Sequence, residues 1–292
     1  MKASAFAYAR ATSVGNALEL LVAHGDGAKV LSGGQSLMPA MNLRLLSPEF
    51  LVDIGDLAEL KGIELTHDIL RIGALTRHVD LLNSPEIAAH APLLMEAIAH
   101  VAHPAIRNKG TLGGSLAHAD PASELPACML ALNATIIVRG PDGERRIAAT
   151  DFFIGIYETA LSARELLVAV EVPVPQKGSV HFFHEFARRH GDYAIVGIAV
   201  QATVKGGIFS ALRIAYFAVG DRPVLADAAA RLINVAVTSA IVSEASAALG
   251  EQLDPQEDQQ ASPAMRRHLA KVLLVRGVST LLGRADLAGG SA

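Results

Sequence analysis

Apolar residues within the first 55 positions recur at spacings that predict one helix and two strands. Ser13 precedes an amphipathic pattern that Gly25 follows, which is typical of a capped helix. Short apolar runs at residues 28–31 and 50–54 predict strands. Because helix and strand alternate here, we expect an α/β layer, and we assign residues 1–55 to an N-terminal subdomain.

A second block, residues 56–177, combines short strand patterns with one long helical pattern. Residues 85–101 place apolar side chains on one side at helical spacing, which predicts a single amphipathic helix. The stretch 103–120 is rich in loop-forming residues, and a further helix is expected to begin near Pro121 with Ser123 as its cap. The predicted strands cover residues 62–65, 70–73, 135–139, 145–148 and 166–172.

A proline-containing linker at residues 173–178 leads into a third block, residues 178–287. Three strand patterns predict a three-stranded antiparallel sheet, and Gly206-Gly207 suits a tight hairpin within it. The strands are expected at residues 180–188, 194–205 and 209–219, and helices near 226–233, 238–249 and 263–282. The length suits two or three packed subdomains, and the three blocks predict a mixed α/β protein of the α+β class.

Composition narrows the classes of protein to which this chain can belong. It is 51% hydrophobic and 18% charged, and its net charge of −4 gives no reason to expect a nucleic-acid partner. The longest uncharged stretches, such as residues 125–138, are too short to span a bilayer, so we expect a soluble, cytoplasmic protein without a transmembrane segment. Cys128 is the only cysteine, which excludes an internal disulfide and leaves too few thiolates for an iron–sulfur cluster.

Two glycine-rich segments carry the clearest chemical signal. Ser32-Gly33-Gly34-Gln35-Ser36 directly follows a predicted strand, where paired glycines allow backbone N–H groups to converge on an anion. Residues 107–116 again combine glycines with hydroxyl side chains. Two such segments suit several polar anchors along one extended ligand, such as the diphosphate of a dinucleotide. From residue chemistry alone, dinucleotide binding and purely structural turns are equal alternatives.

Other common catalytic motifs are missing from the sequence. It contains no G-x-G-x-x-G, no Walker lysine loop and no G-x-S-x-G elbow, which disfavours a Rossmann site, phosphoryl transfer and serine hydrolysis. His100 and His103 are three positions apart, but no third metal ligand is evident nearby, so no metal site is expected. Arg107 and His118, beside the second glycine segment, are candidates for cofactor contacts, with structural or surface roles as alternatives.

The glycine segments and three further motifs resemble the FAD-binding medium subunits of the xanthine dehydrogenase and carbon monoxide dehydrogenase family, the molybdenum hydroxylases. The likeness spans nearly the whole chain, and its motifs follow one another in the same order. These motifs are residues 32–37 with Asn42-Leu43-Arg44, Ile106-Arg107-Asn108 with residues 111–115, Asp120-Pro121-Ala122-Ser123-Glu124, and Ala187-Arg188-Arg189 with Gly191-Asp192-Tyr193-Ala194.

This resemblance implies a two-subdomain FAD-binding fold of the vanillyl-alcohol oxidase (PCMH) type, followed by a C-terminal flavoprotein domain. It implies that backbone amides and hydroxyl groups of both glycine segments hold the FAD diphosphate without a covalent bond. Glu124, where relatives usually carry Asp, is expected near the adenosine, Leu167 beside the adenine, and Tyr193 at the isoalloxazine face, where it could gate an electron acceptor. The implied cofactor-binding residues are Ser32, Gly33, Gly34, Gln35, Ser36, Leu37, Thr111, Leu112, Gly113, Gly114, Ser115, Ala119, Glu124, Leu167 and Tyr193.

Two departures from the family pattern limit what can be carried over. Gln35 stands where a His is often seen, so this loop has no His that could link a flavin. Some relatives have a Lys near His184 or Glu185, and this chain has none there. A cationic contact to the flavin is therefore not expected from that strand.

The resemblance also implies an electron-transfer role in which no side chain acts as a catalytic acid or base. Electrons would leave an organic substrate at a molybdenum cofactor on a large subunit and pass through 2Fe–2S clusters on a small subunit. They would then reduce FAD on this chain, which would pass them to NAD, a quinone or dioxygen. A dimer of heterotrimers is expected. An FAD-free scaffold subunit and an autonomous flavin oxidase of related fold are the alternatives.

Overall fold

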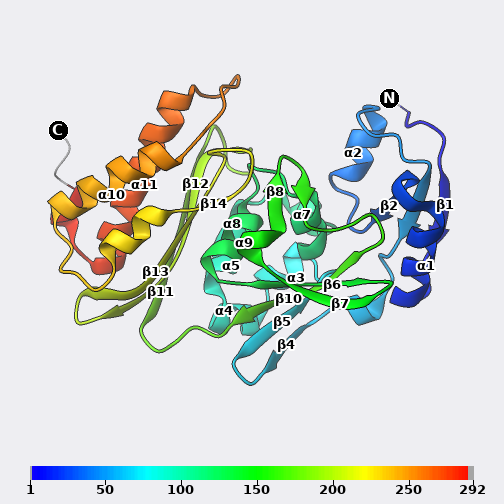
Figure 1. Cartoon of the computed structure of the whole chain (residues 1–292), viewed down its shortest axis with the longest axis horizontal. Helices are drawn as coiled ribbons and strands as arrows, with labels where there is room; N and C mark the ends of the chain where they lie inside the picture. The colour runs from blue at the N-terminus through cyan, green and yellow to red at the C-terminus, as the bar shows by residue number, and fades with distance from the viewer. Residues whose placement is uncertain (1, 289–292) are drawn as a thin grey trace.

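The computed structural model describes residues 2–288. Their strands form three larger sheets and one small hairpin along the longest axis of the molecule (Figure 1). The sheet of the N-terminal segment and the helices of the C-terminal segment lie at opposite ends, with the five-stranded sheet between them. No helix among the described residues has the length and apolar character needed to cross a membrane.

The N-terminal sheet is parallel and places its last strand in the centre. In sheet order the strands are β1 (Ala7–Arg10), β3 (Phe50–Asp53) and β2 (Ala28–Leu31). Helix α1 (Val14–His24) packs on this sheet and begins at Ser13, whose side chain accepts a hydrogen bond from the Asn16 amide. The predicted helix and two strands are confirmed. Strand β1 was not predicted, because four edge residues are too few to show an apolar alternation.

The central sheet is antiparallel, and β10 pairs with β5 on one side and β6 on the other. In sheet order the strands are β4 (Ile63–Thr66), β5 (Ile69–Gly73), β10 (Leu166–Pro173), β6 (Thr135–Gly140) and β7 (Gly143–Ala148). All five strands were predicted, since turns such as Pro141-Asp142-Gly143 fix the hairpins locally. Helix α9 (Ala149–Phe152) leads from this sheet to a small hairpin of β8 (Phe153–Gly155) and β9 (Glu158–Thr159).

Helices cover the central sheet on the side that faces the C-terminal domain. They are α3 (His78–Leu82), α4 (Pro85–His90), α5 (Pro92–His100), α6 (Pro104–Arg107), α7 (Leu112–His118) and α8 (Glu124–Ala131). The single helix predicted over residues 85–101 is wrong, because Pro92 cannot continue the hydrogen-bond ladder and Ala91 leaves the helical region at φ −145°. The stretch 103–120, predicted as loop, contains α6 and α7. Helix α7 was not predicted, because it contains two glycines, which have a low helix propensity.

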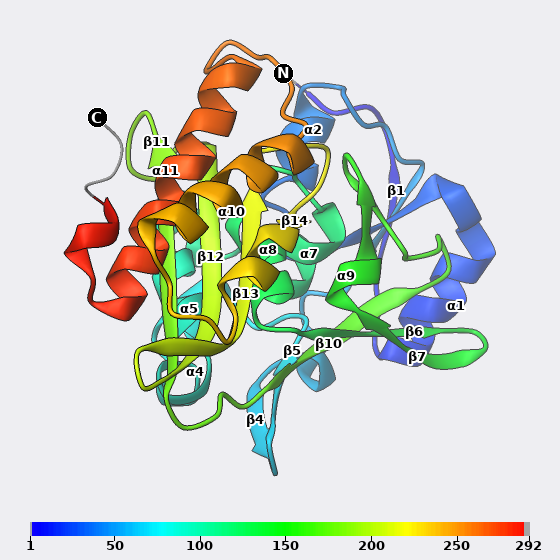
Figure 2. The same cartoon turned by 60° about the vertical axis from the view of Figure 1, so that its left-hand side comes forward.

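The C-terminal sheet is antiparallel and lies between two layers of helices (Figure 2). Its strands are β11 (Ser179–Ala187), β12 (Ala194–Lys205), β13 (Ile208–Phe217) and β14 (Val224–Leu225). The three long strands were predicted, but the two-residue β14 makes the sheet four-stranded. Helices α10 (Ser239–Gln252) and α11 (Pro263–Leu282) were predicted, whereas residues 227–232 form a 3-10 helix rather than an α-helix. Helices α5 and α8 of the central block cover the opposite face of this sheet.

Candidate functional site

The first glycine segment leaves the end of β2 and forms an open turn before α2 (Leu37–Asn42). Gly34 adopts φ +70°, a left-handed conformation that is easy for glycine, and Gln35 Nε2 donates to the Gly33 carbonyl at 2.9 Å. Among the described residues, the backbone N–H groups of residues 32–37 donate to no protein acceptor. Free N–H groups around a left-handed glycine form a concave anion-binding turn. The turn therefore fits a phosphate.

The second glycine segment is not an open turn, which corrects the expectation that its backbone amides hold the diphosphate. Thr111 caps α7, and its side chain accepts a hydrogen bond from the Gly114 amide at 3.1 Å. The amides of Leu112 and Gly113 donate to the carbonyls of Thr76 and Ala74, and that of Ser115 donates to Thr111. These N–H groups are satisfied within the protein. The segment can thus offer the Thr111 hydroxyl, but not a ring of amides.

The two segments meet through their hydroxyl groups and through glycines that allow a close approach. Ser32 Oγ lies 2.8 Å from Thr111 Oγ1. A Cβ on Gly33 would be 2.3 Å from the Lys109 carbonyl oxygen, and a Cβ on Gly113 would be 2.6 Å from the Ala74 Cβ and 2.9 Å from the Ala74 carbonyl oxygen. These distances are below van der Waals contact. Gly33 and Gly113 are thus required by contacts within the protein itself.

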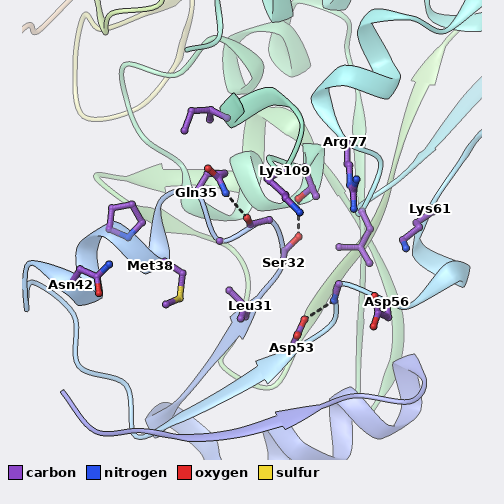
Figure 3. Close-up of a pocket in the computed structure, with 17 residues that line it drawn as sticks. Leu31, Ser32, Gln35, Met38, Asn42, Asp53, Asp56, Lys61, Arg77 and Lys109 are labelled. Carbon is purple, nitrogen blue, oxygen red and sulfur yellow. Dashed lines mark hydrogen bonds between the residues drawn. The ribbon is translucent and has the colours of Figure 1, made fainter. Parts of the chain in front are cut away.

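A cavity of about 570 Å³ opens beside this junction (Figure 3). Three cations line it, with Lys61 and Arg77 on one side together with Lys109 of the second segment, and the carboxylates of Asp53 and Asp56 line it as well. Met38 and Asn42 of α2 face them from the other side. No carboxylate of the described residues lies within 4 Å of these three cations. Unpaired cations next to free amides suit a ligand with two phosphate charges.

The remaining predicted residues lie at differing distances from this cavity. Ser32, Gly33, Gly34, Gln35 and Thr111 line it directly. Ser36 and Leu37 begin α2 behind the turn, and Ser115 Oγ lies 3.3 Å from Ser123 Oγ. The other expected residues are buried in the core, namely Leu112, Gly113, Ala119 and Leu167. Sequence reasoning did not assign Lys61 or Arg77, because no local pattern links them to either glycine segment, and it named Asn42 only as part of the family motif and not as a cofactor contact.

Arg107 has a structural role. Its guanidinium donates to the carbonyls of Val101 and Ala102 at 2.9 and 3.0 Å. These bonds hold a turn in which Ala102 has φ +44°, an uncommon value for a residue with a side chain. The cationic head of Arg107 is thereby occupied, and it does not line the cavity.

A second cavity, of about 400 Å³, lies beyond the other end of α7. Tyr193, 63% exposed, and Tyr157 line it, and the Tyr157 ring lies 4.9 Å from that of His118 at the end of α7. Arg266 forms part of its wall, donating to the Ile195 and Ala218 carbonyls and to Asp258. Helix α7 therefore runs from one cavity to the other. An extended ligand placed along it would reach both.

Glu124 is buried at the start of α8. Burial raises the pKa of its carboxyl to about 8, and the nearby carboxylates of Glu185 and Asp120 add to the rise. A hydrogen bond with Glu185 raises the pKa of His100. The predicted acidic residue is thus mainly protonated at neutral pH. Its environment differs from that of an exposed carboxylate contacting a ribose.

Comparison with known families matches both parts of the chain. Residues 4–175 match the model described as the FAD binding domain in molybdopterin dehydrogenase, and residues 181–281 match the carbon monoxide dehydrogenase flavoprotein C-terminal domain. The chain belongs to this flavoprotein family. It is therefore the FAD-binding medium subunit of a multi-subunit oxidoreductase of the molybdenum hydroxylase class.

Relatives of the flavoprotein subunit agree with it over their full length. It is 40% identical to subunit alpha of the 6-hydroxypseudooxynicotine dehydrogenase complex of Paenarthrobacter nicotinovorans, covering 98% of this chain and 97% of that one. It is 36% identical to the carbon monoxide dehydrogenase medium chain of Hydrogenophaga pseudoflava, covering 96% and 98%. The solved structure of carbon monoxide dehydrogenase from that organism superposes with a TM-score of 0.95 at 37% identity, covering 97% and 99%. Quinoline 2-oxidoreductase from Pseudomonas putida 86 gives 0.91 at 38% identity, also covering 97% and 99%.

Proposed function

We propose that the flavoprotein subunit holds FAD non-covalently with its diphosphate in the turn at residues 32–36. The observation that carries this assignment is the set of N–H groups at residues 32–37 that have no acceptor within the described protein. Ser32 and Thr111 add hydroxyl groups, and Lys61, Arg77 and Lys109 add positive charge. The amides of residues 112–115 contribute indirectly, because they fix α7 beside the turn.

Two side chains support the proposal that the link to FAD is non-covalent. Gln35 cannot form a flavin bond of the kind that His makes, and Cys128 is fully buried within α8. FAD supplies the redox chemistry when bound. The side chains of this subunit then orient the cofactor, exclude water and set the charge around it.

Tyr193 stands where electrons would leave the subunit. It is exposed at the second cavity, and burial of part of the ring raises the pKa of its phenol, so it remains neutral at physiological pH. We assign the flavin ring to the α7 side of this cavity, with Tyr193 controlling access of the external acceptor. Leu167 and Ala119, both buried in the core, would act by shaping the wall and not by polar contact.

The partners and architecture of the complex are inferred from the relatives. Names such as "medium chain" and "complex subunit" support a large molybdenum-cofactor subunit and a small subunit with 2Fe–2S clusters, which would supply electrons to FAD. We further propose a dimer of heterotrimers in the cytoplasm. We also propose that this chain has three structural units, each with one of the three larger sheets, at residues 1–55, 56–177 and 178–287.

Flavin binding by the purified subunit tests this assignment. The chain is titrated with FAD, and bound flavin is measured from its absorbance and quenched fluorescence after removal of free cofactor. Lys109→Gln and Arg77→Gln should each weaken retention, whereas Lys205→Gln, in the distant β12–β13 hairpin, should not. A chain that binds no FAD alone or with its partners would favour the scaffold alternative. Turnover of an organic substrate by the isolated chain would favour the autonomous oxidase.

A further inference from the structure

Two buried glutamates and a half-buried histidine lie where the helices of the central block meet the C-terminal sheet. Glu124 begins α8, His100 ends α5, and Glu185 lies on β11. Glu124 and Glu185 are each 8% exposed. His100 Nδ1 lies 3.2 Å from Glu185 Oε1. We call these three residues the Glu–His–Glu cluster.

One fully buried atom of the Glu–His–Glu cluster has no hydrogen-bond partner among the described residues. It is Oε2 of Glu185, whose side chain is only 3% exposed. A buried carboxylate oxygen without a partner costs free energy, and a simple structural ion pair would satisfy both oxygens. A further proton bound within the cluster would lower that cost, so the arrangement favours proton uptake.

Neighbouring residues connect the cluster to the second glycine segment and to the second cavity. Ser123, which precedes Glu124, places its Oγ 3.3 Å from Ser115 Oγ of the second glycine segment. Asp120 and Tyr193, which line the second cavity, are near enough to Glu124 for their charges to interact. The His100 ring lies 5.5 Å from that of His190, three residues before Tyr193. Charge at the cofactor would therefore be felt by the cluster.

We propose that, in the alkaline range where Glu124 is ionised while the flavin is oxidised, the Glu–His–Glu cluster couples the reduction potential of the bound flavin to pH by binding one proton, at Glu124, when the flavin is reduced. The inference rests on the proposed function, since it requires FAD between the two cavities. Electrons come from the iron–sulfur partner, and the proton comes from solvent. An O–H bond forms on the Glu124 carboxylate during reduction and breaks again when the acceptor removes the electrons.

The direction of this coupling follows from linkage. Electrons added near a carboxylate raise its proton affinity, and a carboxyl that is protonated in turn makes the reduction easier. Because burial raises the pKa of Glu124 to about 8, its titration falls within the range where the enzyme can be measured. The ionisable groups that face the cluster are Glu96, Asp120, Cys128, His184, His190 and Tyr193.

The flavin midpoint potential of the assembled complex, measured by spectroelectrochemistry between pH 7 and pH 9, tests the proposal. Wild type should show a steeper fall with pH than Glu124→Gln near pH 8. One proton per two electrons corresponds to a difference of about 30 mV per pH unit. His100→Gln should move the steep region to higher pH, because loss of a neighbouring cation raises the pKa of the carboxyls. Parallel slopes in wild type and Glu124→Gln would overturn the proposal.

Glu96→Gln is the matched control. Glu96 lies on the same helix as His100 and pairs with His181 of β11 at 3.2 Å, but its side chain is 49% exposed. Its substitution should change the slope much less than Glu124→Gln does, and an equal effect there would overturn a specific role for the cluster. If Glu124→Gln loses FAD, the test rests on His100→Gln. The inference is then overturned if the steep part of the potential-against-pH curve lies at the same pH in His100→Gln and in wild type. A wild-type complex without FAD would overturn both this inference and the proposed function, whereas parallel slopes in FAD-loaded proteins overturn this inference alone.

Discussion

The Ser32 hydroxyl oxygen lies 2.8 Å from that of Thr111, although 79 positions separate the two residues along the chain. This contact joins the turn after β2 to the start of α7, and both residues line the first cavity. Thr111 also caps α7 through the Gly114 amide. Ser32 is therefore the residue whose substitution tests the junction without uncapping a helix.

Ser32→Ala should weaken FAD binding while leaving the fold intact. Loss of one hydrogen bond within the site is worth about 1 kcal/mol, or roughly a fivefold to tenfold increase in the dissociation constant. Fluorescence quenching of FAD gives that constant. Ser47→Ala is the control, because Ser47 pairs with the Ser4 hydroxyl at 3.2 Å on the exposed surface. Equal affinities of Ser32→Ala and wild type for FAD would show that this junction is not part of the binding site.

Gly33→Ala should destabilise the protein as well as release FAD. The new methyl group would lie 2.3 Å from the Lys109 carbonyl, so the two segments must move apart, at a cost of about 1–3 kcal/mol. Thermal unfolding of the cofactor-free chain measures this cost. Gly15→Ala is the comparison, since its methyl group would meet only Ser13 Oγ at 3.7 Å within α1. An unchanged melting temperature for Gly33→Ala would contradict the close approach.

Glu124 should make the cofactor-free chain less stable as pH rises. Its pKa is about 8 in the folded protein against an ordinary value of 4.5, so the folded state holds a proton that the unfolded state loses. Its contribution is fully present below pH 4.5 and declines as pH rises to 8. Glu124→Gln should therefore flatten the dependence of the unfolding free energy on pH in this window. Denaturant titrations at pH 5 and pH 8 measure the difference, and identical profiles would refute the burial argument.

His78 should make the chain less stable as pH falls. Burial lowers the pKa of its imidazole to about 4 from 6.5, so the unfolded state binds a proton that the folded state excludes. Stability attributable to this group is present above pH 6.5 and is lost as pH falls to 4. A Cβ on Gly110 would be 3.0 Å from the His78 ring, next to Thr111. At pH 5, the His78→Phe chain should therefore have a higher free energy of unfolding than wild type and should release less FAD. Equilibrium denaturation measures the first quantity and flavin fluorescence the second.

Tyr193→Ala should retain FAD and change the reaction with the acceptor. The side chain is exposed at the second cavity and is distant from the turn at residues 32–36. Stopped-flow oxidation of the reduced complex by a quinone or by dioxygen should show altered rate constants, with flavin content unchanged. Tyr8→Ala, on the outer edge of the N-terminal sheet, serves as the control. Unaltered oxidation kinetics in Tyr193→Ala would exclude the gating role.

Local sequence determined most of the elements and the chemical character of the first glycine turn. Helix α11 matches its predicted range because Ser262 caps it, Pro263 opens it and Gly283 ends it, and all three signals are adjacent to the helix. The turn at residues 32–36 is likewise readable from paired glycines after a strand. Such features depend on neighbouring residues alone.

Tertiary structure decided which groups are free to bind a ligand. The second glycine segment has the composition of an anion-binding loop, yet its amides are already used by Ala74, Thr76 and Thr111. Likewise, no pattern in the chain brings Glu124, His100 and Glu185 together, since they come from three elements on two sides of a domain boundary. Sequence patterns report preferences of the local backbone, whereas the satisfaction of a buried polar group depends on whatever long-range packing places beside it.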